Sequence, residues 1–223
     1  MNYRHEWKHL ITLSDFITLR QRLPALMQID PHAVNGSYEI RSLYFDNISD
    51  QALREKQDGI SRREKFRLRC YNRDPSLIHL EKKSKLGGLG TKESVLITKE
   101  ETQAILAGDY VWMKHSPDPL IRELYYKITT KQLRPKTIVD YTREPYIFPA
   151  GNVRVTLDYD IRTGLSGIDF LNPDCISIPV RNAPIILEVK WDAYLPDLIR
   201  DAVSLGNQRP CAYSKYASCR VYG

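Results

Sequence analysis

The sequence of 223 residues predicts a single α+β domain, in which helices with clear caps alternate with strands that have one apolar and one charged face. The composition, with 42% hydrophobic and 27% charged residues, is that of a globular chain long enough to bury a core. It excludes a disordered chain, a collagen-like chain and a disulfide-rich miniprotein. Because no internal repeat or low-complexity linker interrupts the chain, we expect one domain over residues 1–223.

Helices are predicted where capping residues flank an apolar face. Ser14–Asp15 begins a helix whose apolar face is interrupted by Pro24. Thr98 and Glu101 form a capping box, and Gly108 ends the short helix that follows them. Three further helices are expected over residues 116–133, 196–205 and 213–220, the last of them short.

Strands are predicted where the side chains alternate with a period of two, over residues 4–8, 65–71, 78–83, 153–160 and 185–190. Each segment places apolar side chains on one face and long charged side chains on the other. In residues 65–71, Lys65, Arg67 and Arg69 share one face, while Phe66 and Leu68 share the opposite face.

The charged faces repeat one combination, a carboxylate two residues away from a lysine, as Glu6/Lys8, Glu81/Lys83 and Glu188/Lys190. A solvated face is common in antiparallel sheets, but the segment around Glu188 is too apolar for an exposed edge strand. We therefore expect a closed sheet whose charged faces share an interior. A polyanion and a divalent metal would supply the counter-charge that buried ions need. Asp158 is left open as a second metal ligand or an arginine partner, and Asp160 is expected to pair with an arginine.

The chain carries 33 Lys and Arg residues against 27 Asp and Glu residues, a formal charge of +6, which predicts an anionic partner. Much of this charge should lie on the inward strand faces, where a column of cations fits a linear phosphate chain better than a duplex or a membrane. Arg62–Lys65 is a charged run, but no RNP, KH or helix-turn-helix pattern accompanies it. We expect no specific nucleic acid as partner.

Other function classes and locations are disfavoured by spacing. His5–His9 fits H-E-x-x-H, but in a strand Glu6 faces away from both histidines, so a zinc protease is not expected. Leu86–Lys92 is predicted as a glycine-rich hairpin rather than a P-loop. The sequence shows no secretory signal and no run of about 20 apolar residues. The four cysteines match no zinc or redox spacing, so we expect a cytoplasmic protein with reduced thiols.

Seven motifs resemble those of the catalytic VTC domain and follow one another in the same order as in that family. The resemblance covers residues 3–216. The motifs are Ser42–Asn47, Lys65–Tyr71, Leu80–Lys85, Tyr141–Arg143, Val153–Asp158, Leu187–Lys190 and Tyr213–Tyr216. The VTC domain is the polyphosphate polymerase of the vacuolar transporter chaperone complex and of bacterial relatives. It is part of the triphosphate tunnel metalloenzyme superfamily, which also holds the CYTH phosphatases.

The resemblance implies an antiparallel eight-stranded β-barrel tunnel with helices packed outside, and it assigns roles to charged residues of this sequence. Metal ligands for Mn²⁺ or Mg²⁺ would be Glu188 and Glu6. The residues implied to act in catalysis are Arg67, Arg69, Lys83, Arg143, Arg154 and Lys190. The residues implied to bind substrate are Lys8, Lys92, Lys215, Arg4 and Glu81.

The function implied is transfer of phosphoryl groups from ATP or another triphosphate to a growing inorganic polyphosphate chain. The first-strand motif reads Arg4-x-Glu6-x-Lys8 where the superfamily's phosphatases have Glu-x-Glu-x-Lys, which favours the polymerase branch. An inorganic triphosphatase of the same fold and a non-catalytic polyanion-binding module remain the alternatives. Family polymerases often work with a membrane component. We therefore expect a separate membrane-protein partner, with this chain at the inner face of that membrane.

Overall fold

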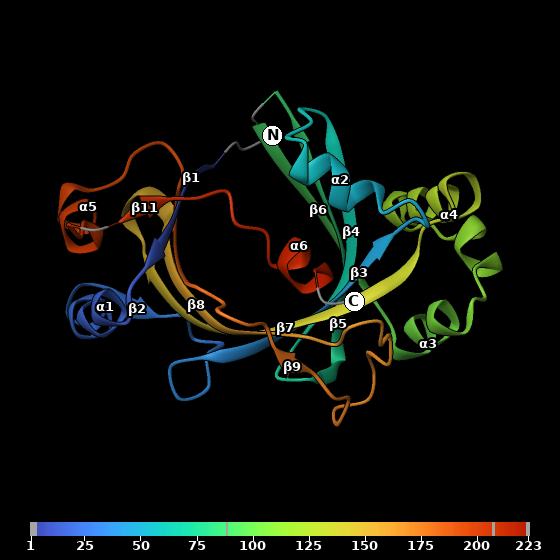
Figure 1. The fold of residues 1–223 in the computed structure, drawn as a ribbon, viewed down its shortest axis with the longest axis horizontal. Coiled ribbons are helices and arrows are strands. Elements are labelled where there is room, and N and C mark those ends of the chain that lie inside the picture. The colour runs from blue at the N-terminus through green and yellow to red at the C-terminus, as the bar shows by residue number, and fades with distance from the viewer. Residues whose placement is uncertain (1–3, 88, 207, 222–223) are drawn as a thin grey trace. The chain divides into compact units, whose positions relative to one another are not determined.

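The computed structural model describes residues 4–87, 89–206 and 208–221, and it shows an α+β protein with a large antiparallel sheet (Figure 1). The strands are β1 (His5–Ile11), β2 (Gln28–Ile29), β3 (Tyr38–Asp46), β4 (Arg63–Tyr71), β5 (Asp74–Leu86), β6 (Leu89–Ile97), β7 (Arg134–Phe148), β8 (Val153–Thr163), β9 (Ile178–Pro179), β10 (Ile185–Trp191) and β11 (Arg209–Pro210). The helices are α1 (Leu13–Leu26), α2 (Gln51–Gln57), α3 (Lys99–Ala107), α4 (Pro119–Lys131), α5 (Asp197–Val203) and α6 (Lys215–Arg220), with 3-10 turns η1 (Val111–His115) and η2 (Ala150–Asn152).

Neighbouring strands follow the order β11-β1-β10-β8-β7-β3-β4-β5-β6, with β2 also paired to β7 and β9 to β8. Three of the eleven strands, β2, β9 and β11, have only two residues each, so eight longer strands remain. Closure of these strands into a barrel stays a prediction.

The chain forms two compact units, and strands β3, β7, β8 and β9 contribute residues to both. The first unit comprises residues 1–39, 141–161 and 179–214, and the second comprises residues 40–140, 162–178 and 215–223. Each unit has a hydrophobic core of its own. The prediction of a single domain over the whole chain stays a prediction.

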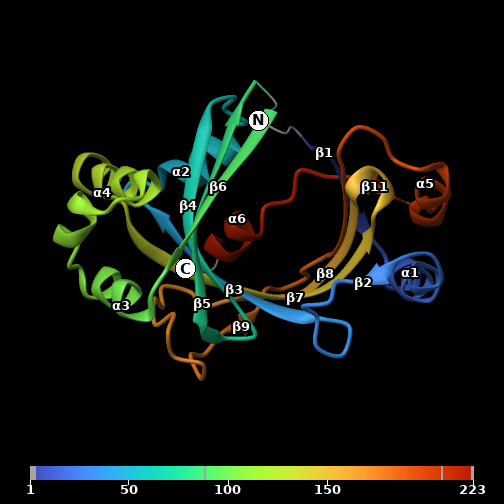
Figure 2. The ribbon, with the colours of Figure 1, turned by 180° about the vertical axis from the view of Figure 1, so that it is seen from behind.

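In the first unit, α1 and α5 lie together on one side of the strands β1, β8 and β10 (Figures 1 and 2). Leu19 and Leu23 of α1 are fully buried in one core with Val155 and Leu187. The capping box of α1 uses Thr12 rather than the predicted Ser14, with Asp15 as its partner. Pro24 lies in the last turn and does not break the helix there. It removes one i→i−4 hydrogen bond from this turn, and the helix ends two residues later at Leu26.

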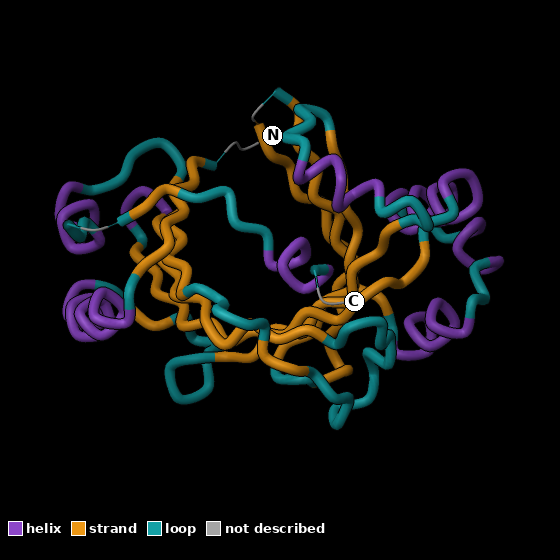
Figure 3. The backbone as a smooth tube through the Cα atoms, viewed as in Figure 1, coloured by secondary structure: helices purple, strands orange, loops and turns teal. Residues whose placement is uncertain are grey.

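In the second unit, the purple helices α3 and α4 lie beside the orange strands β4 and β5 (Figure 3). Their core includes Phe66 and Leu80 from the strands and Leu124 from α4. The capping box predicted for α3, with Thr98 as N-cap and Gly108 after the last turn, is confirmed. Helix α4 begins after Asp118 rather than at Ser116, because the Asp118 carboxylate accepts hydrogen bonds from the backbone N–H groups of residues 120 and 121.

One carboxylate, that of Asp46 at the end of β3, joins α2 and α6 within the second unit. It accepts hydrogen bonds from the backbone N–H groups of Ala52 (2.9 Å) and Leu53 (3.1 Å) at the start of α2. It also accepts one from the Tyr216 hydroxyl of α6, at 2.6 Å. Helix α2 is absent from the sequence prediction, since its cap comes from a strand residue rather than from its own N-terminus. The short helix α6 was predicted and is confirmed.

A buried ion pair connects β3 to β7 and to a loop in the second unit. The Arg41 side chain donates to both carboxylate oxygens of Asp140, at 3.0 and 2.9 Å, and both residues are at most 2% exposed. It also donates to the backbone oxygens of Asn172 (2.6 Å) and Cys175 (3.4 Å).

None of the helices in the described part of the chain has the length and apolar character needed to cross a membrane.

Candidate functional site

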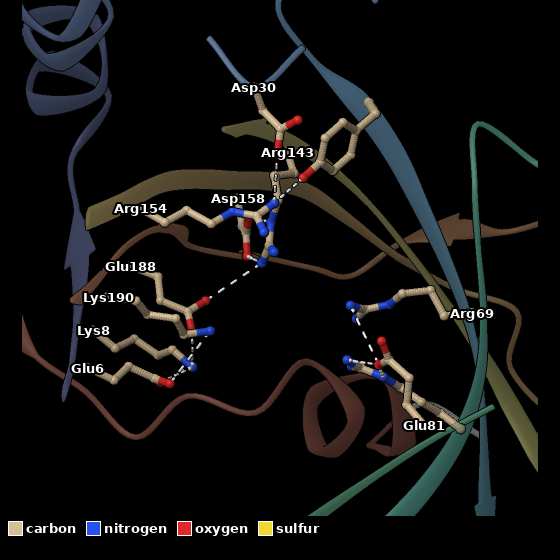
Figure 4. Close-up of polar contacts among 12 residues, drawn as sticks. Glu6, Lys8, Asp30, Arg69, Glu81, Arg143, Arg154, Asp158, Glu188 and Lys190 are labelled. Carbon is tan, nitrogen blue, oxygen red and sulfur yellow. Dashed lines mark hydrogen bonds and ion pairs between the residues drawn. The ribbon is translucent and has the colours of Figure 1, made fainter. Parts of the chain in front are cut away.

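The charged strand faces predicted from the sequence form two clusters of side chains, one in each unit. In the first unit, β1, β10 and β8 pair so that Lys8 lies opposite Glu188, and Glu188 lies opposite Thr156. The row beside it aligns Glu6, Lys190 and Arg154. The Glu188 cluster, drawn in Figure 4, consists of Glu6, Lys8, Arg143, Arg154, Asp158, Glu188 and Lys190.

Glu188 is 5% exposed and lies among three cations. Its carboxylate is 2.7 Å from Lys190 Nζ, 3.6 Å from Arg143 Nη2 and 4.0 Å from Lys8 Nζ. Glu6 bridges the same two lysines, at 3.4 Å to Lys8 and 3.7 Å to Lys190. Burial alone would lower the pKa of Lys8, but the charges of Glu188 and Glu6 outweigh it and raise that pKa above its ordinary value. Lys8 is thus held as a cation next to two carboxylates.

Arg143 is held by a second carboxylate on the neighbouring strand. Its Nε and Nη2 atoms donate to the two oxygens of Asp158 at 2.6 and 2.7 Å, and Asp158 is fully buried. Burial alone would lower the pKa of Arg143, but the charge of Asp158 raises it well above the ordinary value. Of the two roles left open for Asp158, the structure therefore supports that of arginine partner. Asp160 lies exposed at a left-handed φ of 47°, and its pairing with an arginine stays a prediction.

Two further arginines differ in their relation to this cluster. Arg154 contacts the Tyr38 hydroxyl and lies 3.5 Å from the Asp30 carboxylate. Arg4 instead pairs with Asp192, whose carboxylate lies 3.0 Å from Arg4 Nε, and it also donates to the backbone oxygen of Asn152. Arg154 joins the Glu188 cluster through its register opposite Lys190, and the roles that the resemblance implies for Arg154 in catalysis and for Arg4 in substrate binding stay predictions.

The donor chemistry of the Glu188 cluster fits a hard divalent cation that also binds phosphate. Mg²⁺-like ions are commonly held by one or two carboxylates, with phosphate oxygens and water completing the shell. Glu188 and Glu6 supply two carboxylates, and the Thr156 hydroxyl beside Glu188 is buried without a hydrogen-bond partner. The residues described in the structure contain no group of three or more His, Cys, Asp or Glu side chains suited to a metal ion. Other ligands would have to come from substrate or water.

In the second unit, β3, β4 and β5 align Tyr44, Arg67 and Glu81 in one row. Glu81 is 1% exposed, and Arg67 donates to it through Nε at 2.7 Å, with Nη2 at 2.5 Å. Lys92 Nζ lies 2.6 Å from Glu81 Oε1, the other carboxylate oxygen. Arg69 Nη1 lies 3.7 Å from Glu81 Oε2, the oxygen that Arg67 contacts. The Glu81 cluster consists of Tyr44, Arg67, Arg69, Glu81 and Lys92. Figure 4 draws the contact between Glu81 and Arg69.

The next row, on β4, β5 and β6, brings three lysines into register. They are Lys65 on β4, Lys83 on β5 and Lys92 on β6. Like charges directly opposite one another repel, so a bound anion in this row would be stabilising. Lys215, the remaining predicted residue, is the half-buried first residue of α6. The glycine-rich hairpin predicted over residues 86–92 joins β5 to β6 as expected, although residue 88 of its turn lies outside the described residues.

The two clusters differ in charge. The Glu188 cluster has four cations and three carboxylates, so it is nearly balanced. The Glu81 cluster has three cations and one carboxylate, with Lys65 and Lys83 in the adjoining row. Because the excess positive charge lies around Glu81, that cluster is the stronger candidate for binding an anion. Sequence reasoning missed Tyr44 there, although Tyr44 is part of a motif quoted for the resemblance.

The pKa of Glu81 predicts how this cluster responds to acid. Burial alone would raise that pKa, but Arg67, Arg69 and Lys92 lower it far below its usual value of 4.5. A carboxylate with a depressed pKa stabilises the folded state above pH 4.5, and this contribution is lost as the pH falls further. We expect Glu81→Gln to lower the free energy of unfolding by about 2 kcal/mol at pH 7. The difference between pH 7 and pH 3 should be smaller than in the wild type.

Urea unfolding at the two pH values measures this difference. Glu93→Gln, on the adjacent strand and 53% exposed, is the matched control and should change the free energy by less than about 0.5 kcal/mol. Equal pH dependence in the wild type and Glu81→Gln would contradict the assignment.

Comparisons with known proteins bear on the whole chain. No curated protein matches it in sequence. Among solved structures, the PH1819 and PH1012 proteins of Pyrococcus horikoshii OT3 are 14% and 12% identical to it, with TM-scores of 0.44 and 0.46. These matches cover 90% and 91% of this chain and 84% and 85% of the others. A Bacillus halodurans protein provisionally assigned as an adenylate cyclase is 14% identical, with a TM-score of 0.49, over 85% of this chain and 80% of its own.

The family comparison is more specific than these structural similarities. The model of the VTC domain matches residues 3–222, which is nearly the whole chain and includes both clusters. A match of this extent, together with the ordered motifs, shows that the chain belongs to the VTC-domain family.

Proposed function

We propose that this chain is a polyphosphate polymerase that transfers phosphoryl groups from ATP to a growing inorganic polyphosphate chain. The proposal depends on one observation: in a chain of the VTC-domain family, buried carboxylates hold arginines and lysines in fixed positions on the charged strand faces. Such preorganised cations suit phosphate oxygens, because they need little rearrangement when charge develops on the transferring group. The eight-stranded tunnel implied by the resemblance is part of the same proposal.

Phosphoryl transfer requires little covalent chemistry from the protein, so positioning and charge carry the reaction. Around Glu81, the guanidinium groups of Arg67 and Arg69 would orient phosphates, with Lys83 and Lys92 beside them. Around Glu188, Arg143 and Lys190 would stabilise negative charge. A Mn²⁺ or Mg²⁺ ion held by Glu188 and Glu6 would neutralise charge on the phosphates. Arg154 is also proposed to act in catalysis. The remaining residues proposed to bind substrate are Lys8, Lys215, Glu81 and Arg4, which directly precedes the first strand.

Incubation of the purified chain with ATP and Mn²⁺ separates this function from its alternatives. Long chains on a polyacrylamide gel that an exopolyphosphatase degrades would support the polymerase. Release of phosphate from tripolyphosphate without chain formation would identify a triphosphatase instead. Tight polyphosphate binding with neither reaction would identify a binding module. A separate membrane-protein partner and a cytoplasmic location at that membrane are further parts of the proposal.

Replacing Glu188 tests the proposed metal site. We expect Glu188→Gln to lower chain synthesis by about 10²-fold, because the amide keeps the shape of the side chain but loses the charge that attracts a metal. Mn²⁺ binding, measured by electron paramagnetic resonance of the free ion, should weaken by about tenfold without any substrate present. Asp197→Asn, an 80% exposed aspartate of α5, is the control and should change neither measurement. Unchanged Mn²⁺ binding and synthesis in folded Glu188→Gln would exclude Glu188 as the metal ligand.

A further inference from the structure

The aromatic residue of the Glu81 cluster, Tyr44, was not assigned a role by the sequence pattern. Tyr44 is 4% exposed, and its hydroxyl accepts a hydrogen bond from Arg67 Nη1 at 2.8 Å. The Nε atom of the same guanidinium donates to Glu81 at 2.7 Å. Arg67 is therefore held between a carboxylate and a phenol, and Tyr44 limits the positions that the guanidinium can take.

The surroundings of Tyr44 are strongly cationic. From β4, Lys65 Nζ lies 5.5 Å and the Arg67 guanidinium 5.6 Å from the centre of its ring, both within cation–π range. Arg69 is the third cation of β4 that acts on the hydroxyl. From β5, Glu81 contributes its negative charge, and it is paired with Arg67. These cations favour negative charge at the phenolic oxygen.

A second tyrosine packs against Tyr44 but lies in the opposite electrostatic environment. The ring of Tyr216, from α6, lies 5.0 Å from the ring of Tyr44. Its hydroxyl donates to the Asp46 carboxylate at 2.6 Å, and burial together with that contact raises its pKa above the ordinary value of 10.0. Tyr216 should therefore keep its proton, and it provides an internal control for Tyr44.

We propose that Tyr44 is a positioning residue of the anion site, whose hydroxyl holds the Arg67 guanidinium and whose proton is retained when an anion binds. The identity of that anion as a phosphate chain depends on the proposed function. In the neutral form, Tyr44 leaves the positive charge of the arginines available to a phosphate. In the ionised form, after release of the proton to solvent, the phenolate occupies the same cations and competes with the anion.

The proton would be exchanged in an accessible pH range. Burial alone would raise the pKa of the Tyr44 hydroxyl, but the charges of Arg67, Lys65 and Arg69 and the hydrogen bond from Arg67 lower it to about 8. By linkage, if the ionised form binds the anion less well, a bound anion must raise the pKa of Tyr44. Anion affinity should be constant below pH 8 and should fall by up to about tenfold per pH unit above it.

Tyrosinate absorbance at 295 nm, recorded from pH 6 to pH 10, tests the proposal. We expect the wild type to show the ionisation of one tyrosine near pH 8, and tripolyphosphate to move that step to higher pH. The step should be absent in Tyr44→Phe and present in Tyr216→Phe. At pH 7, Tyr44→Phe should bind tripolyphosphate about tenfold more weakly, the loss expected for one hydrogen bond to a charged group. Its affinity should no longer fall above pH 8.

NMR of wild-type protein labelled with ¹³C at tyrosine Cζ measures the same ionisation without a variant, so a Tyr44→Phe chain that fails to fold does not prevent the test. A step near pH 8 that tripolyphosphate shifts supports the proposal even if no polyphosphate is ever synthesised, in which case only the proposed function fails. The absence of a step near pH 8, or a step that tripolyphosphate does not move, would overturn the role given to Tyr44.

Discussion

Replacing Arg67 by alanine is expected to lower polyphosphate synthesis by at least about 10²-fold, because Arg67 is the cation that links Glu81 to Tyr44 in the Glu81 cluster. Its guanidinium contacts Glu81 and Tyr44 and is itself buried, with 6% of the residue exposed. The variant removes a proposed phosphate ligand and also leaves Glu81 with fewer counter-charges. Synthesis from ATP and Mn²⁺, measured as chain length and yield on a gel, gives the result.

Two variants separate the catalytic effect of Arg67 from a loss of stability. The double variant Arg67→Ala/Glu81→Gln removes the unbalanced carboxylate, so it should recover stability relative to Arg67→Ala while remaining inactive. Arg62→Ala removes an exposed positive charge just before the same strand and should retain synthesis. Wild-type synthesis by folded Arg67→Ala would contradict the place given to the Glu81 cluster in the reaction.

Replacing Arg41 by alanine is expected to have the largest effect on stability, a loss of about 3–5 kcal/mol in the free energy of unfolding. The variant leaves the Asp140 carboxylate, which is 2% exposed, without its bidentate partner. It also removes the donor to the backbone oxygens of Asn172 and Cys175, which attach the loop over residues 164–177 to the sheet. Urea or thermal unfolding measures the change.

The matched control for Arg41 is an arginine that contacts the same loop from a more exposed position. Arg73 Nη1 donates to the backbone oxygen of Pro173 at 2.7 Å, at an exposed site. Arg73→Ala should lower the free energy of unfolding by less than about 1 kcal/mol. Similar losses in the two variants would mean that the loop attachment, rather than the buried ion pair, determines the stability.

The alternation of side chains was sufficient to predict which strand faces carry charge. Residues 65–71 and 185–190 were assigned from a period of two, and the structure places Arg67 and Glu188 on faces opposite the apolar side chains. The capping box at Thr98 likewise depends on residues only three positions apart. Such local features are set by backbone geometry within a few residues, so a sequence shows them directly.

Contacts between strands could not be predicted in the same way, because they depend on register. Arg67 meets Glu81 and Arg143 meets Asp158 only because each pair of strands is aligned as it is. A shift by one residue would turn the charged side chains to the other face. The carboxylates predicted as metal or substrate ligands thus turned out to be bound by arginines and lysines of neighbouring strands. Helix α2 was missed because its cap, Asp46, belongs to a strand.

The contacts of Asp46 also constrain the order in which the chain can assemble during synthesis. The Tyr216 hydroxyl that binds Asp46 lies 170 residues further along the chain, so α6 docks only after most of the second unit has emerged from the ribosome. Until α6 docks, the Tyr44 ring lacks its aromatic neighbour Tyr216, and the surroundings of the cations near Tyr44 are incomplete. A nascent chain should therefore complete the Glu81 cluster, the proposed phosphate site, in one late step, when a contact of very high sequence separation forms.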